Sequence, residues 1–102
     1  MIYGLHFLSE VEEDVFSAYE WYEEKALGLG EEFLRIFYAY AGSIPQNPLL
    51  YPKVHREFRR CLLIRFPYAV YFRIVDNTII VYGLFHCARN PRAIKTTLQN
   101  RH

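Results

Sequence analysis

The sequence predicts an α+β fold from three observations. Apolar residues recur at helical spacing in the first half of the chain, whereas the second half carries runs rich in β-branched and aromatic residues. A Gly-Leu-Gly triplet at 28–30 divides the helical part in two, and Pro91 opens a short basic tail. The expected order is an N-terminal β-strand, an α-helical hairpin, a three-stranded antiparallel meander and a short C-terminal helix. At 102 residues with 52% hydrophobic content, we expect one domain over residues 1–102.

The first strand is predicted at residues 2–8, a short aromatic run. Ser9 and Glu12 have the S-x-x-E spacing of a capping box, which predicts that a helix begins there. The apolar positions of this helix are Val11, Val15, Ala18, Tyr19, Tyr22 and Ala26. Trp21 is expected to pack in the core rather than to serve as a recognition aromatic.

The second helix follows the glycine turn. Gly28 suits the left-handed position after a helix, and Glu31 and Glu32 suit the positive end of the next one. Its apolar stripe consists of Phe33, Ile36, Phe37, Tyr40 and Ile44. The pair at 47–48, Asn-Pro, is expected to end it, because proline disfavours the helical conformation of the residue before it.

Three strands are predicted in the second half, at 58–64, 68–75 and 78–86, separated by Phe66-Pro67 and Asp76-Asn77. The segment 46–53 between the last helix and the first of these strands is expected to be a loop. Asn90 resembles an N-cap, with proline at the first position of the tail helix. We expect the helical hairpin to cover one face of the sheet.

The net charge of +1 conceals two oppositely charged halves. Residues 1–52 hold two basic residues against nine acids, a net charge of −7, and residues 53–102 hold ten basic residues against two acids, a net charge of +8. This asymmetry predicts a face for a polyanion or an acidic partner.

Several classes of function are disfavoured. No run approaches the roughly 20 apolar residues of a membrane span, and no basic leader is present, so we expect a soluble cytoplasmic protein without a membrane partner. Cys61 and Cys87 are expected to be free thiols in apolar surroundings. With His55 and His86 they lack zinc-type spacing, so we expect no metal. No phosphate loop, nucleophile elbow or dinucleotide motif is present, and no cofactor is expected.

A basic face with one imidazole is the candidate site. The side chains expected on the uncovered sheet face are Arg59, Arg60, Arg65, Arg73, His86 and Arg89. In RNA cleavage His86 could act as acid or base while Arg65, Arg73 and Arg89 stabilise charge on the phosphate. The alternative for each of them is a structural role in surface ion pairs or hydrogen bonds. Structural or incidental roles are expected for His6, His55 and His102.

Five segments together resemble the RelE/ParE toxin superfamily. They are Ala18-Tyr-Glu-Trp-Tyr22, Gly28-Leu-Gly-Glu-Glu-Phe33, Asn47-Pro48, Arg59-Arg60 with Arg65-Phe-Pro-Tyr68, and His86-x-x-Arg89-x-Pro91. In this order they span about Ser9 to Pro91. The resemblance implies a strand, a helical hairpin and a small antiparallel sheet, and a plasmid-stabilisation type of toxin that a cognate antitoxin holds inactive.

The resemblance also implies two mechanisms. ParE-like members inhibit DNA gyrase without catalysis, and RelE-like members are ribosome-dependent mRNA endonucleases. The Trp-Tyr helix, the Gly-Leu-Gly turn and the His-x-x-Arg ending favour the ParE-like branch, as do the near-neutral charge and the lack of lysine in the last three strands. His86, however, matches a position where some nucleases place a catalytic histidine. An inactive toxin-fold protein in a regulatory complex is a third alternative. The sequence is compatible with a homodimer or a hetero-oligomer with the antitoxin.

Overall fold

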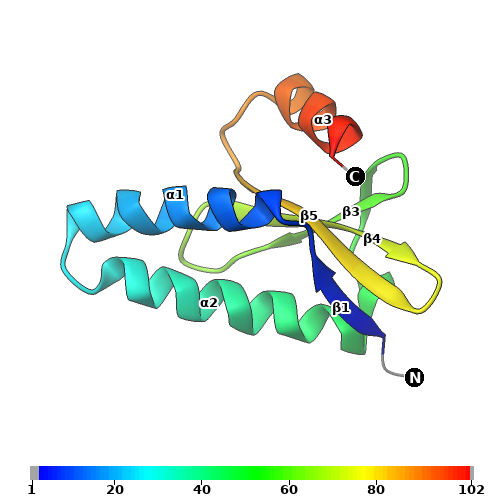
Figure 1. The fold of residues 1–102 in the computed structure, drawn as a ribbon, viewed down its shortest axis with the longest axis horizontal. Helices are drawn as coiled ribbons and strands as arrows, with labels where there is room; N and C mark the ends of the chain where they lie inside the picture. The colour runs from blue at the N-terminus through cyan, green and yellow to red at the C-terminus, as the bar shows by residue number, and fades with distance from the viewer. Residues whose placement is uncertain (1–2, 102) are drawn as a thin grey trace.

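The computed structural model describes residues 3–101 and has the predicted α+β architecture (Figure 1). Its elements in chain order are β1 (Gly4–Phe7), α1 (Glu10–Lys25), α2 (Leu29–Ser43), the 3₁₀ turns η1 (Ile44–Gln46) and η2 (Pro48–Leu50), β2 (Lys53–His55), β3 (Phe58–Leu62), β4 (Tyr68–Val75), β5 (Thr78–His86) and α3 (Pro91–Asn100). The predicted strands at 68–75 and 78–86 are confirmed at both ends.

One sheet joins all five strands in the order β1-β5-β4-β3-β2. The strand β1 pairs parallel to β5, and the other neighbours pair antiparallel. The strand β2 was not predicted, because proline bounds its short sequence on the N-terminal side; Lys53 nevertheless pairs with Arg59 on β3. The strand predicted at 58–64 ends earlier, at Leu62. Ile2 of the predicted first strand lies outside the described residues.

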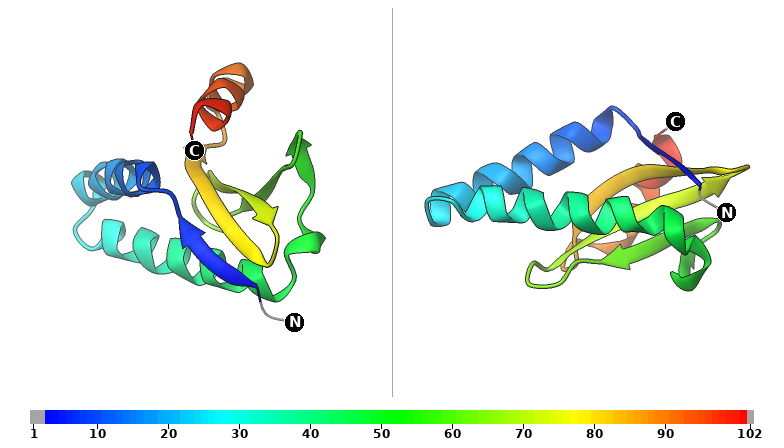
Figure 2. Two further views of the ribbon diagram at one scale, coloured as in Figure 1. Left: turned by 45° about the vertical axis from the view of Figure 1, so that its right-hand side comes forward. Right: turned by 90° about the horizontal axis from the view of Figure 1, so that it is seen from below.

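The helices α1 and α2 run antiparallel against one face of the sheet (Figure 2). Val11, Val15 and Ala18 of α1 and Phe33 and Phe37 of α2 are buried there. At the hairpin end of the core, the ring centroids of Tyr22, Phe33, Phe66 and Tyr68 lie between 4.8 and 6.1 Å apart. Burial of these large rings supplies the main driving force for docking the hairpin on the sheet.

A carboxylate organises the turn between the two helices. Gly28 has φ = +87°, as predicted for a left-handed residue after a helix. The Glu23 carboxylate accepts the backbone N–H groups of Gly28 at 3.0 Å and of Gly30 at 2.9 Å, so it neutralises the free donors at the start of α2. A Cβ on Gly30 would lie 2.7 Å from the Tyr19 carbonyl oxygen. Glycine at position 30 therefore lets the two helices approach closely.

The predicted start of α1 is confirmed, since the helix begins at Glu10, but the predicted capping box and the predicted end of α2 were wrong. Ser9 has helical angles and its hydroxyl points to Glu10 Oε1 at 3.3 Å, so the capping box with Glu12 does not form. A capping residue needs an extended backbone for its side chain to reach back. The helix α2 ends at Ser43 rather than near Asn47, because Pro45 has no N–H to continue the ladder and the chain tightens into η1.

Trp21 does not pack in the core. Its side chain is 54% exposed, and Lys25 Nζ lies 4.1 Å from the ring centroid. On this turn of α1, Tyr22 is the residue that packs against the core. Trp21 precedes it in the chain and therefore lies about 100° away from it around the helix axis. The prediction for Trp21 was therefore wrong.

Candidate functional site

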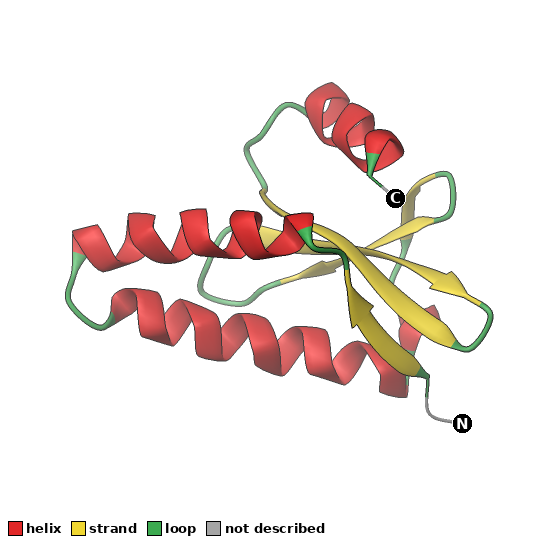
Figure 3. Ribbon diagram, viewed as in Figure 1, coloured by secondary structure: helices red, strands yellow, loops and turns green. Residues whose placement is uncertain are grey.

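The helix α3 covers the sheet face opposite the hairpin (Figure 3). Asn90 Oδ1 accepts the backbone N–H of Arg92 at 2.8 Å, which confirms the predicted N-cap, and Ile94 and Leu98 are buried beneath the helix. This face was expected to be open. The amphipathic tail instead folds back over it, because its apolar stripe at i and i+4 has no other partner. Two clefts remain between α3 and the sheet.

The first, the Arg60 cleft, has a volume of about 220 Å³. Its polar lining comes from β2, β3, β4 and the segment around α3, and consists of His55, Arg60, Tyr71, Cys87, Arg89 and Lys95. His55 Nε2 lies 3.2 Å from the Gln99 side-chain amide. This arrangement brings an imidazole and three cations to one cleft, whereas the sequence had suggested only an incidental role for His55.

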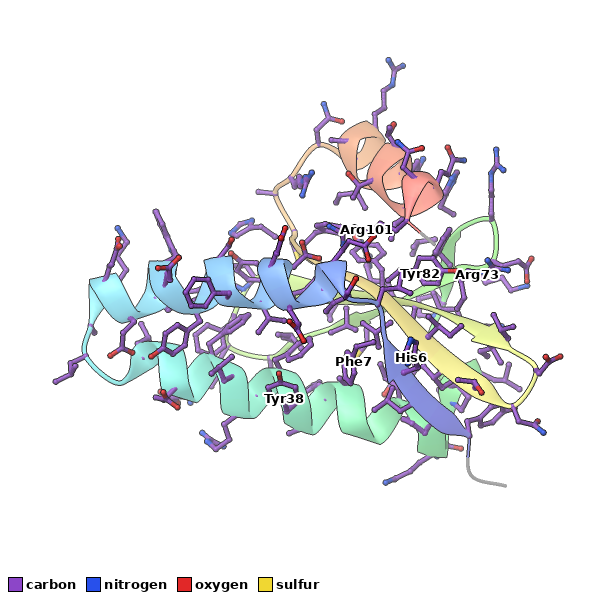
Figure 4. The ribbon with its side chains drawn as sticks, in the orientation of Figure 1. His6, Phe7, Tyr38, Arg73, Tyr82 and Arg101 are labelled. Atoms are coloured by element: carbon purple, nitrogen blue, oxygen red, sulfur yellow. The ribbon has the colours of Figure 1, made fainter. Side chains whose placement is uncertain are left out.

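The second, the Arg73 cleft, has a volume of about 410 Å³. Its charged lining residues are Arg56, Glu57, Arg73 and Arg101, and Phe58, Tyr82 and Leu98 add apolar surface. Figure 4 shows Arg73, Tyr82 and Arg101 close to one another below α3. The Arg73 guanidinium lies 5.8 Å from the Phe58 ring centroid and 5.9 Å from that of Tyr82.

Arg101 closes one side of this cleft through an ion pair with Asp14 of α1. The guanidinium donates to both carboxylate oxygens, at 2.6 and 3.0 Å, and to the Tyr82 carbonyl at 2.8 Å. Asp14 Oδ2 also accepts the backbone N–H of Leu84 at 3.2 Å. The hydrogen bond with Asp14 raises the pKa of Arg101, although burial opposes that shift. No local pattern could have predicted this contact, because its partners lie 87 positions apart.

Arg59 and Arg65 do not belong to the face under α3. Arg59 pairs with Phe72, on the hairpin side, and its Nη1 donates to the Tyr51 carbonyl at 2.7 Å. Arg65 lies beyond β3 in a turn with φ = +76° and forms an ion pair with Glu32 of α2. The expected shared parity of the two arginines is therefore absent, because the strand ends before Arg65.

His86 is also separated from the arginines under α3. Its Nδ1 accepts the backbone N–H of Ala88 at 3.0 Å, and its ring centroid lies 5.1 Å from that of Tyr68. Tyr71 pairs with Gly83 but Phe72 pairs with Val81, so a bulge at Tyr82 turns His86 to the face opposite to the one predicted for it. The sequence could not locate that bulge.

The strand register gives the distance between His86 and Arg73 along the sheet. His86 pairs with Tyr68, and Arg73 lies five residues further along β4. At about 3.3 Å per residue, the two Cα positions are roughly 16 Å apart along the sheet. Arg89 connects the two regions, since it lines both the Arg60 cleft and the surface cleft that contains His86 and Trp21. Its guanidinium lies 4.8 Å from the Phe85 ring centroid.

The structure offers little support for a cysteine nucleophile or a metal site among the described residues. Burial raises the pKa of the Cys61 thiol, which keeps it neutral and a poor nucleophile. Within residues 3–101, no group of three or more His, Cys, Asp or Glu side chains could hold a metal ion. Within the same residues, no helix has the length and apolar character needed to cross a membrane.

Comparison of sequences gives a relative over most of the chain. The chain is 28% identical over 92 residues to the toxin ParE2 of Mycobacterium tuberculosis, and the match covers 89% of this chain and 88% of ParE2. No family model matches the chain.

Solved structures share the fold. The chromosomal ParDE system of P. aeruginosa matches with a TM-score of 0.70 and 18% identity, over 83% of this chain and 96% of that one. A variant of the E. coli toxin RelE in the free state matches with a TM-score of 0.65 and 10% identity, over 97% of both chains. The RelBE2 toxin-antitoxin complex of M. tuberculosis gives 0.55 and 17%, over 84% and 99%. The chain is thus similar in sequence to the toxin ParE2 and shares the fold of the ParDE, RelE and RelBE2 structures.

Proposed function

We propose that the chain is a ParE-like toxin, which inhibits DNA gyrase by binding it and is neutralised by a cognate antitoxin. Of the four residues expected to act in RNA cleavage, three are dispersed over the molecule, and this dispersal is the observation that carries the proposal. His86 accepts a local backbone hydrogen bond, Arg65 is paired with Glu32, and Arg73 lies under α3. A general acid or base must lie within about 3 Å of the proton it transfers. A set of residues separated by roughly 16 Å along one strand pair cannot act on one phosphate.

The antitoxin is proposed to bind the basic half of the chain, at the surface around α3. The P. aeruginosa and M. tuberculosis neighbours are a ParDE system and a RelBE2 complex, which supports an antitoxin partner. Arg56, Arg89, Arg92 and Lys95 are exposed there and none belongs to an ion pair among the described residues. An acidic tail that folds on binding would meet complementary charge. A complex with the tail confined to the acidic helices would contradict this placement.

The test is inducible expression of this chain alone in a bacterial host, with plasmid supercoiling and mRNA integrity measured in the same cultures. The proposal predicts growth arrest, disturbed DNA topology and intact mRNA. It also predicts that His86→Ala arrests growth as the parent does, since His86 has no catalytic role. Ribosome-dependent mRNA cuts would reject gyrase inhibition, and harmless expression would indicate an inactive toxin-fold protein.

The Arg60 cleft favours one alternative, an mRNA endonuclease with residues other than those the sequence suggested. His55 supplies an imidazole to a cleft that also holds Arg60, Arg89 and Lys95. In such an enzyme, His55→Ala and Arg60→Gln would each abolish mRNA cleavage, while His86→Ala would not. Loss of cleavage only in His86→Ala would instead restore the mechanism suggested by the sequence.

A further inference from the structure

We propose that the Arg73 cleft binds a phosphate group between the guanidinium groups of Arg56 and Arg73. This site is independent of gyrase inhibition. It also differs from the Arg60 cleft, with which it shares only Leu98. The proposal rests on an unsatisfied cation, on the charge balance of the cleft and on its size.

Arg73 is a partly buried cation without an anionic partner. The ion pairs among residues 3–101 are Arg35–Glu32, Lys53–Glu57, Arg65–Glu32 and Arg101–Asp14, and none includes Arg73. Arg73 Nε is buried and has no hydrogen-bond partner among those residues. The Nη1 atom makes one long contact, 3.4 Å, with the Tyr82 hydroxyl. Buried donors in proteins almost always have an acceptor, and an anion bound to the Arg73 guanidinium would supply the missing one.

The charges that line the cleft leave two cations uncompensated. Arg101 is neutralised by Asp14, since both side chains are largely buried and joined by two hydrogen bonds. Glu57 is directed to Lys53, with Nζ and Oε1 3.3 Å apart, and its side chain is 67% exposed. Arg56 is exposed in the β2–β3 turn and Arg73 projects from β4. Two unneutralised guanidinium groups that line one cleft match the charge of a phosphate, which carries between one and two negative charges near pH 7.

Size and shape favour a phosphate ester over a lone carboxylate. Guanidinium presents planar paired donors, and a tetrahedral phosphate offers oxygens to two such groups at once. The volume of about 410 Å³ lies within the range of small-ligand sites. The Gln99 side-chain amide oxygen accepts from Arg56 Nε and Nη2, both at 3.1 Å, which holds this guanidinium beside the cleft, and the Tyr82 hydroxyl lies next to Arg73.

The test is isothermal titration of the full chain, made by cell-free synthesis, with inorganic phosphate at constant ionic strength. The parent and Arg92→Gln are expected to bind phosphate equally. Arg92 lies on α3, the helix above both clefts, but its side chain lines neither of them. Arg73→Gln is expected to bind roughly tenfold to a hundredfold more weakly, the loss of a charged hydrogen bond. Arg56→Gln, on an exposed turn, should weaken binding similarly and does not depend on how well a variant at position 73 folds.

Further titrations identify the source of the phosphate. If a mononucleotide and a single-stranded oligonucleotide bind with equal affinity, the natural ligand is a free phosphate ester. If the oligonucleotide binds with much higher affinity, the natural ligand is a nucleic-acid backbone. Equal losses in Arg92→Gln and Arg73→Gln would overturn the proposal, because they would reflect general charge screening. Binding of a glutamate-rich peptide without any binding of inorganic phosphate would also overturn it, in favour of a carboxylate site.

Discussion

Arg101 and Asp14 fix the end of the chain to the start of the first helix. The pair is largely buried, is bidentate, and also satisfies the N–H of Leu84 on β5. It therefore joins α1, β5 and the end of α3 at one point. A buried pair need not stabilise a protein relative to apolar residues, but the loss of one partner leaves the other charge uncompensated.

Asp14→Ala is expected to lower the free energy of unfolding by about 3 kcal/mol, because it leaves both the Arg101 guanidinium and the Leu84 N–H without their acceptor. Arg101→Gln should cost less, since Asp14 keeps its bond with Leu84. Urea unfolding of both single variants and the double variant measures the coupling, expected at about 1–3 kcal/mol. Additive single effects would show that the ion pair contributes nothing specific.

Cys61 predicts a loss of stability in alkali. Burial raises the pKa of its thiol in the folded state. Above a pH of about 9, the unfolded chain releases this proton while the folded chain retains it, so the free energy of unfolding falls as pH rises from there towards the folded-state pKa. Below that pH the contribution is fully present. Burial likewise raises the pKa values of Tyr22 and Tyr68, which extends the decline upward from a pH of about 10.

Urea unfolding at a series of pH values from 7 to about 10 checks this. Cys61→Ala should show a shallower decline above a pH of about 9, whatever its stability at neutral pH. Cys87→Ala, which removes an exposed thiol, is the matched control and should follow the parent curve. An identical slope in parent and Cys61→Ala would exclude the thiol as the cause.

Single residues also limited what the sequence could predict about the site. The face that carries a side chain depends on register, and the extra residue at Tyr82 reverses the parity of the strand between Ile80 and His86. Arg65 was predicted to lie on the uncovered sheet face, but the strand before it ends three residues earlier, at Leu62. An error of one residue in the predicted register moves a side chain to the other face of the sheet. The sequence could therefore predict that a basic face exists, but not which arginines lie on it.

Among the elements, the helical hairpin was the most predictable and its turn the most constrained. The glycines at 28–30, the apolar stripes and the acids at the start of α2 all favour one geometry, so local and tertiary preferences agree. The position of α3 was not predictable in the same way. Its cap was evident from Asn90, but its docking depends on Arg101 and Leu98, which meet partners remote in sequence.

Gly30→Ala and Gly42→Ala form a matched pair of substitutions in α2. A Cβ at position 30 would lie 2.7 Å from the Tyr19 carbonyl oxygen, so Gly30→Ala must separate the helices and is expected to cost about 1–3 kcal/mol. A Cβ at position 42 meets nothing within 4 Å, so Gly42→Ala should stabilise the fold by about 0.5–1 kcal/mol. Thermal unfolding of both variants should therefore give shifts of opposite sign. Shifts of the same sign would contradict the close approach at Gly30.

At the scale of the molecule, the division of charge becomes a spatial one. The acidic first half forms the hairpin and β1, and the basic second half forms the rest of the sheet and α3. The opposite ends of this charge distribution attract different partners. A binding partner should be oriented before contact, because fields of this kind act over about 10 Å at moderate salt.

Association with the proposed antitoxin should therefore depend on salt. The association rate is expected to fall steeply between about 0.1 M and about 1 M salt, while the dissociation rate changes less. Surface plasmon resonance with Lys95→Glu should show slower association at low salt than with Glu20→Gln, a charge change on the exposed side of α1. Equal effects of the two substitutions would place the antitoxin contact outside the basic half.

The pairing of β1 with β5 has a consequence for synthesis of the protein. Gly4 is a register partner of Thr78, 74 positions later, so the edge of the sheet cannot form until most of the chain has left the ribosome. Local contacts of the hairpin form early, whereas the pairing that completes the sheet has a long loop to close. The nascent chain is thus a helical hairpin without its finished sheet. At roughly 5–20 residues per second, an interval of several seconds separates the start of synthesis from the first moment at which the complete surface could bind a target.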